Sequence, residues 1–144
     1  NLVYLWARKE YRNLTQCYEA GIPVPRPLYV TNNVLAMEFI GDGGAPARSL
    51  LTSEVDENDY AQAISILDDL YNKAKLVHGD FSEYNIFKTE KGLVVFDLGS
   101  GVDLRHPNAQ EFLKRDINNI GRFFNKRGIS VPVPLKVAAK LRPP

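Results

Sequence analysis

The sequence has few of the residues that mark secreted or membrane proteins. Its 144 residues include a single cysteine, Cys17, so no disulfide can form within the chain, which favours a reducing compartment. No apolar run approaches the ~20 residues that a membrane-spanning helix needs, and no segment has the pattern of a signal peptide. We therefore expect a cytoplasmic protein that makes no membrane contact.

Acidic residues are missing from one end of the chain. Residues 117–144 carry six basic side chains and no acidic one, whereas residues 1–116 carry 17 acidic and 12 basic side chains. The formal net charge of +1 conceals this uneven distribution. Such a basic segment contacts nucleic-acid phosphates in some proteins and forms a solvated surface in others, and both interpretations stay open.

The spacing of apolar residues predicts an α+β fold. Helical periodicity extends over residues 2–20, 56–75 and 107–128, with Pro107 as the first residue of the third helix, and a short turn of helix is predicted around residues 135–141. Two strand pairs are predicted, residues 28–31 with 34–40 and residues 86–88 with 93–97, and Asn32-Asn33 is a two-residue hairpin signal in the first pair.

A short segment rich in glycine divides the chain. Residues 41–46 read Gly-Asp-Gly-Gly-Ala-Pro, a composition that predicts a flexible break. The break separates residues 1–40, a helix with a hairpin, from residues 41–144, which contain the other predicted helices and the basic end. We expect these two parts to be lobes of one fold.

The residues that indicate chemistry lie in segment 78–85, His-Gly-Asp-Phe-Ser-Glu-Tyr-Asn. Asp80 and Asn85 are separated by four residues, and Asp97 ends an apolar strand twelve residues after Asn85. Phosphoryl transfer from ATP needs a carboxylate that positions the attacking hydroxyl and oxygen ligands that hold magnesium. Asp80 can be that base or orienting group, with Asn85 and Asp97 as metal ligands. The spacing therefore predicts an ATP-dependent phosphotransferase.

His78 has two interpretations. It can be a third metal ligand or an acid–base group, since imidazole does both. It can also be a core histidine that hydrogen-bonds the backbone and braces the loop, and we favour this second interpretation.

Residues 78–85 resemble the catalytic loop of the protein-kinase-like fold, and Ser-Glu-Tyr-Asn at 82–85 is similar to the RIO family of atypical serine/threonine kinases. Further segments occur in the order of that family: residues 9–14, 21–27 and 37–41, then His106-Pro107 leading into Arg115-Asp116 and Phe123-Phe124. Segments 10–14 and 37–41 resemble the type-one subfamily. The loop begins His-Gly-Asp, where type-one members commonly have His-Ala-Asp.

The resemblance implies a two-lobed kinase-like fold that binds Mg-ATP between its lobes, with Mn²⁺ as an alternative ion. Asp80 would be the catalytic aspartate and Asn85 and Asp97 the metal ligands, with Asp97 the aspartate that some members phosphorylate. Residues on the nucleotide side would be Met37 as gatekeeper, the backbones of Glu38 and Ile40 on adenine, Glu10 as partner of an ATP-anchoring lysine, and Ser82 near the phosphates or the substrate.

RIO family members act in maturation of the small ribosomal subunit, as protein kinases or as ATPases. The resemblance therefore implies precursor small-subunit particles as partners, with ribosomal RNA contact through residues 117–144, and it indicates no particular oligomeric state. It also implies that Gly79 stands where ordinary protein kinases have an arginine that reads a phosphorylated activation loop.

The chain has no glycine-rich loop and no lysine-bearing strand before Glu10. We therefore expect a fragment of a longer protein, with an incomplete small lobe and weak or no ATP binding by itself. Only 47 residues follow Asp97, so the large lobe is expected to be reduced.

Two alternative functions stay open at this point. A small-molecule phosphotransferase of the aminoglycoside or choline kinase type has the same His-Gly-Asp-x4-Asn loop, although its large lobe is usually bigger. A non-catalytic assembly factor that docks on the ribosomal precursor would retain the loop as a scaffold.

Overall fold

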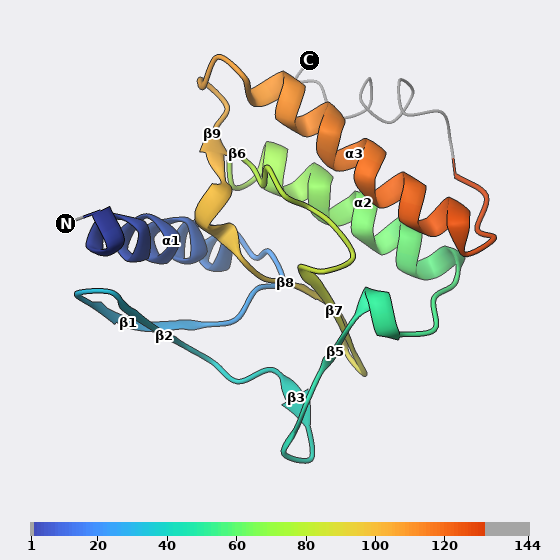
Figure 1. Ribbon diagram of the computed structural model, residues 1–144, viewed down its shortest axis with the longest axis horizontal. Helices are drawn as coiled ribbons and strands as arrows, with labels where there is room; N and C mark the ends of the chain where they lie inside the picture. The colour runs from blue at the N-terminus through green and yellow to red at the C-terminus, as the bar shows by residue number, and fades with distance from the viewer. Residues whose placement is uncertain (1, 132–144) are drawn as a thin grey trace.

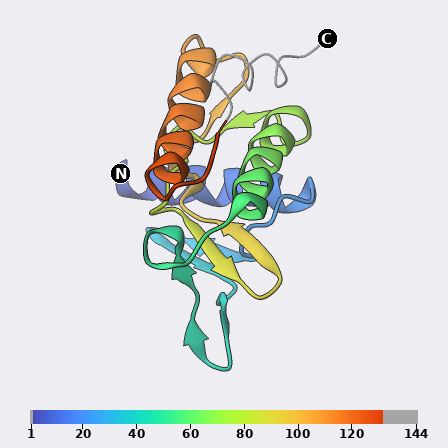
Figure 2. The ribbon, with the colours of Figure 1, turned by 90° about the vertical axis from the view of Figure 1, so that its right-hand side faces the viewer.

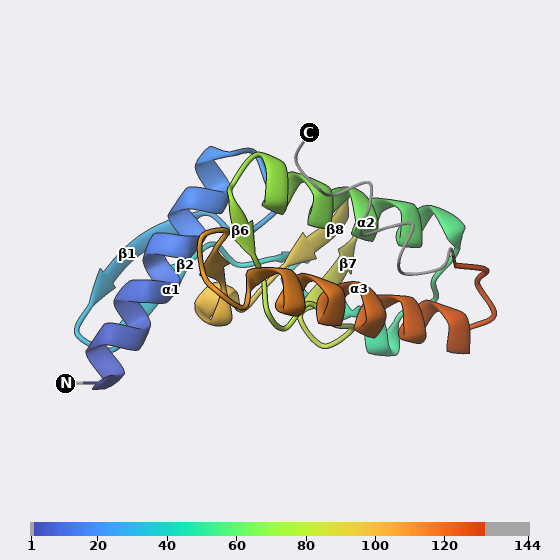
Figure 3. The ribbon, with the colours of Figure 1, turned by 90° about the horizontal axis from the view of Figure 1, so that it is seen from above.

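The computed structural model describes residues 2–131, and within this range it forms three α-helices. They are α1 (Leu2–Glu19), α2 (Glu57–Asn72) and α3 (Ala109–Lys126). Helices α2 and α3 lie side by side and antiparallel, and short strands separate them from α1 (Figures 1 and 3). All three predicted helices in this range are confirmed, whereas the predicted turn of helix at 135–141 lies outside the described residues.

Two antiparallel hairpins have the predicted positions. Strands β1 (Pro27–Thr31) and β2 (Val34–Met37) are joined by the predicted Asn32-Asn33 turn. Strand β2 ends at Met37 rather than at Ile40, and the residue opposite Met37 is Pro27, which has no N–H to donate to the ladder. The second hairpin consists of β7 (Ile86–Thr89) and β8 (Gly92–Val95).

Shorter strands complete the sheets. Strand β5 (Arg48–Ser49) pairs with β7, and β6 (Leu76–Val77) pairs with β9 (Val102–Asp103). Two 3₁₀ turns, Leu50–Thr52 and Leu98–Ser100, follow β5 and precede β9 respectively. Strands β6 and β9 lie between α1 and the helices α2 and α3 (Figure 1). The N-terminal helix α1 therefore lies beside segments from the second half of the described chain.

The predicted flexible break at 41–46 is wrong in part. Strand β3 (Gly41–Asp42) pairs with β4 (Ala45–Pro46), and this hairpin projects away from α2 and α3 (Figure 2). Gly43 and Gly44 form the two-residue turn between these strands, with φ angles of +59° and +85°. Positive φ at both positions is typical of such hairpin turns and favours glycine. The division into lobes 1–40 and 41–144 stays a prediction.

The start of α3 also differs from the prediction. The helix begins at Ala109 rather than at Pro107, because the preceding residues form a separate turn. In this turn the ring Nδ1 of His106 accepts the Asn108 N–H at 3.0 Å, and the His106 carbonyl accepts the Ala109 N–H at 3.0 Å. The predicted end near Gly128 is confirmed, since α3 ends at Lys126.

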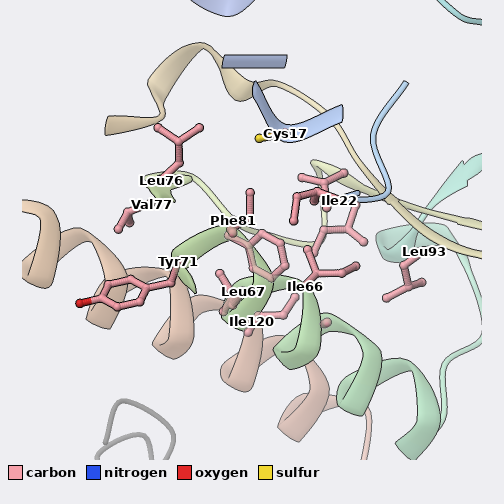
Figure 4. Packing of buried hydrophobic residues seen from close by; sticks show 14 of the residues in the cluster. Cys17, Ile22, Ile66, Leu67, Tyr71, Leu76, Val77, Phe81, Leu93 and Ile120 are labelled. Carbon is pink, nitrogen blue, oxygen red and sulfur yellow. The ribbon is translucent and has the colours of Figure 1, made fainter. Parts of the chain in front are cut away.

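The core lies between the helices and the hairpin β7–β8. Phe81 of the catalytic loop is fully buried and lies among Ile66, Leu67 and Ile120 of α2 and α3 (Figure 4). Cys17 of α1 is buried at the edge of the same cluster, and burial raises the pKa of its thiol to about 12. The loop that carries the candidate chemistry is therefore anchored by its own core residue.

The first turn of α2 is closed by a capping box. The Asp59 N–H donates to Oδ1 of Asp56 at 3.0 Å, and the Asp56 N–H donates to Oδ2 of Asp59 at 3.0 Å. Asp59 also pairs with Lys88 of β7 at 2.8 Å, so the start of the helix is tied to the central hairpin. This arrangement accounts for the helix beginning at Glu57.

We expect Asp56→Ala to lower the free energy of unfolding by about 1 kcal/mol, because it removes the side-chain acceptor of the cap. Urea denaturation of the protein measures the change. Glu57→Ala is the matched control, since it removes an acidic residue from the same turn without removing a cap hydrogen bond. Equal losses in the two variants would contradict the role of the cap.

Candidate active site

The loop of residues 78–85, which we call the catalytic loop after the kinase segment that it resembles, runs from β6 to β7 and is braced by its first residue. His78 is fully buried. Its Nδ1 accepts the Asp80 N–H at 3.0 Å, so the proton lies on Nε2, which donates to the Phe96 carbonyl at 2.9 Å. This geometry confirms the interpretation of His78 as a core histidine that braces the loop.

A buried carboxylate from α3 holds the same loop from the other side. Asp116 is fully buried and accepts the N–H of Gly79 at 2.8 Å and the N–H of Phe81 at 3.1 Å. Burial raises the pKa of Asp116, against the opposing effects of these two donors and of the positive charge of Arg115. The neighbouring Arg115 donates to the Gly79 carbonyl at 2.6 Å. Helix α3 thus fixes the backbone on both sides of Asp80.

The path of the loop favours glycine at position 79. Its φ is +85°, a conformation that other residues adopt at a cost. A Cβ at this position would lie 3.0 Å from the Ser100 carbonyl oxygen. The loop therefore passes close to the 3₁₀ turn that follows Asp97, which brings the two functional segments together.

The structure places Asp80, Asn85 and Asp97 at one end of the hairpin β7–β8. Asn85 directly precedes β7, and its carbonyl accepts the Phe96 N–H at 2.8 Å, one residue before Asp97. The Asn85 amide donates to the carbonyl of Asp80 at 2.8 Å and to its Oδ2 at 3.0 Å. Because the amide nitrogen is committed to Asp80, the amide oxygen is the group left to act as a ligand.

Asp97 has the backbone of a sharp turn, with φ 58° and ψ 67°. Its side chain is exposed and forms no ion pair with any described residue. Glu10 of α1 is half-buried, and burial together with the negative charge of Asp97 raises the pKa of its carboxyl. The two acidic groups therefore interact electrostatically, and neither forms an ion pair with another residue in the range 2–131, which favours binding of a positive ion or a lysine.

Asn13 joins α1 to this turn. Its side chain is buried, and its Nδ2 donates to the carbonyls of Leu98 at 2.9 Å and Gly101 at 3.2 Å. Leu98 is the first residue of the 3₁₀ turn that follows Asp97, and Gly101 comes directly after that turn. The position of Asp97 relative to Glu10 is consequently set by a hydrogen-bonded link rather than by loop contacts alone.

The ligand set matches magnesium bound together with phosphates. Among residues 2–131, no group of three or more His, Cys, Asp or Glu side chains is arranged to hold a metal ion alone. Magnesium is commonly held by one or two carboxylates, with phosphate oxygens and waters completing its coordination. One carboxylate from Asp97 and one amide oxygen from Asn85 fit that arrangement.

The predicted adenine contacts have suitable backbone groups. The Glu38 N–H donates to the Arg26 carbonyl at 2.9 Å, and the Ile40 carbonyl accepts the Ala47 N–H at 3.1 Å. The Glu38 carbonyl and the Ile40 N–H take part in no hydrogen bond within the described part of the chain. Met37 is half-buried against the core at the end of β2. The roles of these three residues stay predictions.

Ser82 has a structural role in the loop. Its hydroxyl accepts the Tyr84 N–H at 3.4 Å, and its carbonyl accepts the Asn85 N–H at 3.0 Å. Ser82 also lines a cleft together with Asp80. The Ser82 hydroxyl therefore caps a turn within the loop, while a phosphate or substrate contact stays a prediction.

Sequence reasoning did not assign roles to Asn13, Arg115 and Asp116. A signal was present, because two of them are polar residues on apolar helix faces. Asn13 precedes the buried Leu14 and lies one turn from Cys17, and Asp116 lies beside Ile117. Buried polar groups need partners, so such residues predict an internal hydrogen bond, although periodicity alone does not identify the partner.

Comparison with known proteins identifies the family. A family model described as the RIO domain matches residues 1–137, and the chain therefore belongs to the RIO domain family. The probable serine/threonine-protein kinase RIO1 homolog of Encephalitozoon cuniculi is 45% identical, over 90% of this chain and 34% of that protein. The RIO-type serine/threonine-protein kinase Rio1 of Thermoplasma acidophilum is 42% identical, over 90% of this chain and 68% of that protein. These relatives confirm the type-one resemblance.

A solved structure confirms the protein-kinase-like fold. The Rio2 kinase from Chaetomium thermophilum, in an ADP/Mg²⁺–phosphoaspartate complex, superimposes with a TM-score of 0.80 and 29% identity. The match covers 97% of this chain and 45% of the Rio2 chain. The chain thus spans about a third of the Encephalitozoon relative and less than half of the solved one.

We expect Asp116→Asn to lower the free energy of unfolding by about 1–3 kcal/mol, because one buried N–H of the catalytic loop loses its acceptor. Urea denaturation measures this loss. Glu111→Gln is the control, since it removes an exposed negative charge from the same helix. A variant Asp116→Asn as stable as Glu111→Gln would contradict the role assigned to the buried carboxylate.

We expect Asn13→Ala to accelerate amide hydrogen exchange in residues 98–101, because two buried carbonyls lose their only side-chain donor. Hydrogen exchange followed by mass spectrometry resolves this segment. Asn72→Ala, which removes an exposed asparagine bonded to Asp68, is the control. Unchanged exchange in residues 98–101 would show that α1 does not hold the turn.

Proposed function

We propose that this chain carries out ATP-dependent phosphoryl transfer to a seryl or threonyl hydroxyl, or to water. The observation that carries the proposal is the position of Asp80. Its backbone is fixed by His78 and by the hydrogen bonds that Asp116 accepts from the residues on either side of it. Its carboxylate is exposed and accepts a hydrogen bond from the Asn85 amide. A carboxylate held in this way is preorganised to position a hydroxyl.

Each residue of the site has a distinct role in the proposal. Asp80 orients the acceptor hydroxyl and takes its proton. Asn85 and Asp97 hold magnesium, which when bound supplies the positive charge that neutralises the phosphates. Glu10 contributes negative charge near Asp97 and is placed to receive the ammonium group of an ATP-anchoring lysine.

The relatives support this assignment. Those described above are named serine/threonine-protein kinases, and the solved Rio2 complex contains ADP, Mg²⁺ and a phosphoaspartate. We therefore propose ATP and Mg²⁺ as cofactors, with Mn²⁺ as an alternative ion, and Asp97 as the aspartate that can carry a phosphoryl group. Membership of the RIO domain family argues against an aminoglycoside or choline kinase.

The cellular setting that we propose is cytoplasmic maturation of the small ribosomal subunit. Family membership motivates this setting, with precursor particles as the partner. No helix among the described residues combines the length and apolar character that crossing a membrane requires. Contact of ribosomal RNA with residues 117–144 stays a prediction, because three of its six basic residues, Lys136, Lys140 and Arg142, lie outside the described residues.

We expect Asp80→Ala and Asp97→Ala each to lower kcat/KM for ATP turnover by about 100-fold or more, because each removes a group on which phosphoryl transfer depends. ADP release by the full-length protein, with and without small-subunit particles, measures the effect. Asp42→Ala, on the projecting β3–β4 hairpin, is the control and should retain activity.

Undiminished ADP release in both variants would overturn the assignment of the site. Absence of ADP release from the unmodified protein, with retained binding to particles, would instead support a non-catalytic docking module.

A further inference from the structure

A cleft opens beside Asp80 on the side away from the metal ligands. Its volume is about 480 Å³, and neither Asn85 nor Asp97 lines it. We call it the acceptor cleft and define it by the residues that line it: Leu51, Asp80, Ser82, Glu83, Tyr84, Asn119, Arg122, Phe123, Lys126 and Arg127. A cleft of this size encloses a few side chains rather than a protein surface.

One wall of the acceptor cleft is the last two turns of α3. Asn119, Arg122 and Lys126 follow one another at helical spacing and face the cleft. Arg122 and Lys126 are exposed, and neither forms an ion pair with any residue in the described range. Two positive charges that form no ion pair among the described residues therefore line the same cleft as the carboxylate of Asp80, which receives the acceptor hydroxyl in the proposed function.

Arg127 has a different role from its two basic neighbours. Its guanidinium donates to the carbonyls of Leu51 at 2.6 Å and Ser53 at 2.9 Å, and it lies 4.8 Å over the Phe123 ring. These contacts tie the end of α3 to the 3₁₀ turn on the opposite wall. The charges of Arg122 and Lys126 are thus presented from a fixed helix end.

On the basis of the proposed function, we infer that the acceptor cleft selects a peptide acceptor with a carboxylate or phosphate close to the phosphorylated hydroxyl. Arg122 and Lys126 would bind that anion, while Asp80 contacts the hydroxyl. The carboxylates of Asp80 and Glu83 line the same cleft and disfavour a continuous phosphate backbone. A peptide avoids this repulsion because it carries negative charge at single side chains.

The test compares two serine peptides that differ only in flanking residues, Asp and Glu in one and Asn and Gln in the other. Phosphorylation by the full-length protein gives kcat/KM for each. We expect the acidic peptide to be preferred by about fivefold to tenfold at low salt, from two exposed ion pairs that each contribute a few-fold. The preference should shrink as salt screens the charges.

In the double variant Arg122→Glu/Lys126→Glu we expect the preference to disappear or reverse. Arg122→Gln/Lys126→Gln, which removes charge without adding any, should bring the ratio close to one and provides the test if the reversal impairs folding. Lys114→Glu changes the net charge by as much as the Gln double variant and is its control, because Lys114 lies exposed on the same helix and outside the acceptor cleft. It should retain the full preference.

A binding measurement separates this inference from the proposed function. Fluorescence anisotropy with the acidic peptide, its serine replaced by alanine, measures peptide binding to the acceptor cleft without requiring turnover. Charge-dependent binding without ADP release would overturn the proposed function and would support the inference that the acceptor cleft binds an acidic peptide. ADP release with equal use of both peptides would overturn the inference alone. Displacement of the peptide by an RNA oligonucleotide of equal charge at lower concentration would overturn it in favour of nucleic acid.

Discussion

The carboxylate of Asp116 is the group on which the geometry of the site depends. Burying a charge is unfavourable unless hydrogen bonds replace its lost hydration, and here two loop N–H groups do so. Removing the carboxylate would leave those N–H groups buried without an acceptor. The residue between the two donors in sequence is Asp80, so the side chain that we propose as the catalytic carboxylate projects from a backbone whose neighbours on both sides are held by α3.

Helix α1 has the corresponding role for the metal-ligand turn. The Asn13 side chain donates to the carbonyls of Leu98 and Gly101, in and directly after the turn that follows Asp97. Glu10 lies one turn earlier on the helix, and burial together with the negative charge of Asp97 raises its pKa. The hairpin β7–β8 lies between these two supports, with the proposed metal ligand Asn85 directly before β7 and the proposed ligand Asp97 two residues after β8. Displacement of α1 would therefore move Asp97 relative to Asn85, whereas displacement of α3 would move Asp80. The site is sensitive to both helices through different residues.

The sequence was sufficient for the elements with strong periodicity and for the motif residues. The three helices, both long hairpins and the core position of His78 were predicted because apolar spacing and turn residues are local signals. The predicted boundaries of elements were wrong where particular hydrogen bonds or their absence matter. Strand β2 ends opposite Pro27, and a turn with a hydrogen bond to the His106 ring precedes α3. Paired strands form at 41–46, where a flexible break was predicted. The partners of Asn13 and Asp116 could not be predicted, because each bond joins residues far apart in the chain.

The conformation of Gly79 has a consequence for engineering this chain. Ordinary protein kinases place an arginine before the catalytic aspartate, where it senses a phosphorylated activation loop. Here that position has φ +85°, and a Cβ would meet the Ser100 carbonyl at 3.0 Å. An arginine introduced at position 79 would strain the backbone that carries Asp80 and press against the Ser100 backbone. That substitution alone would therefore not install the same control in this chain, because the path of the loop would have to shift with it.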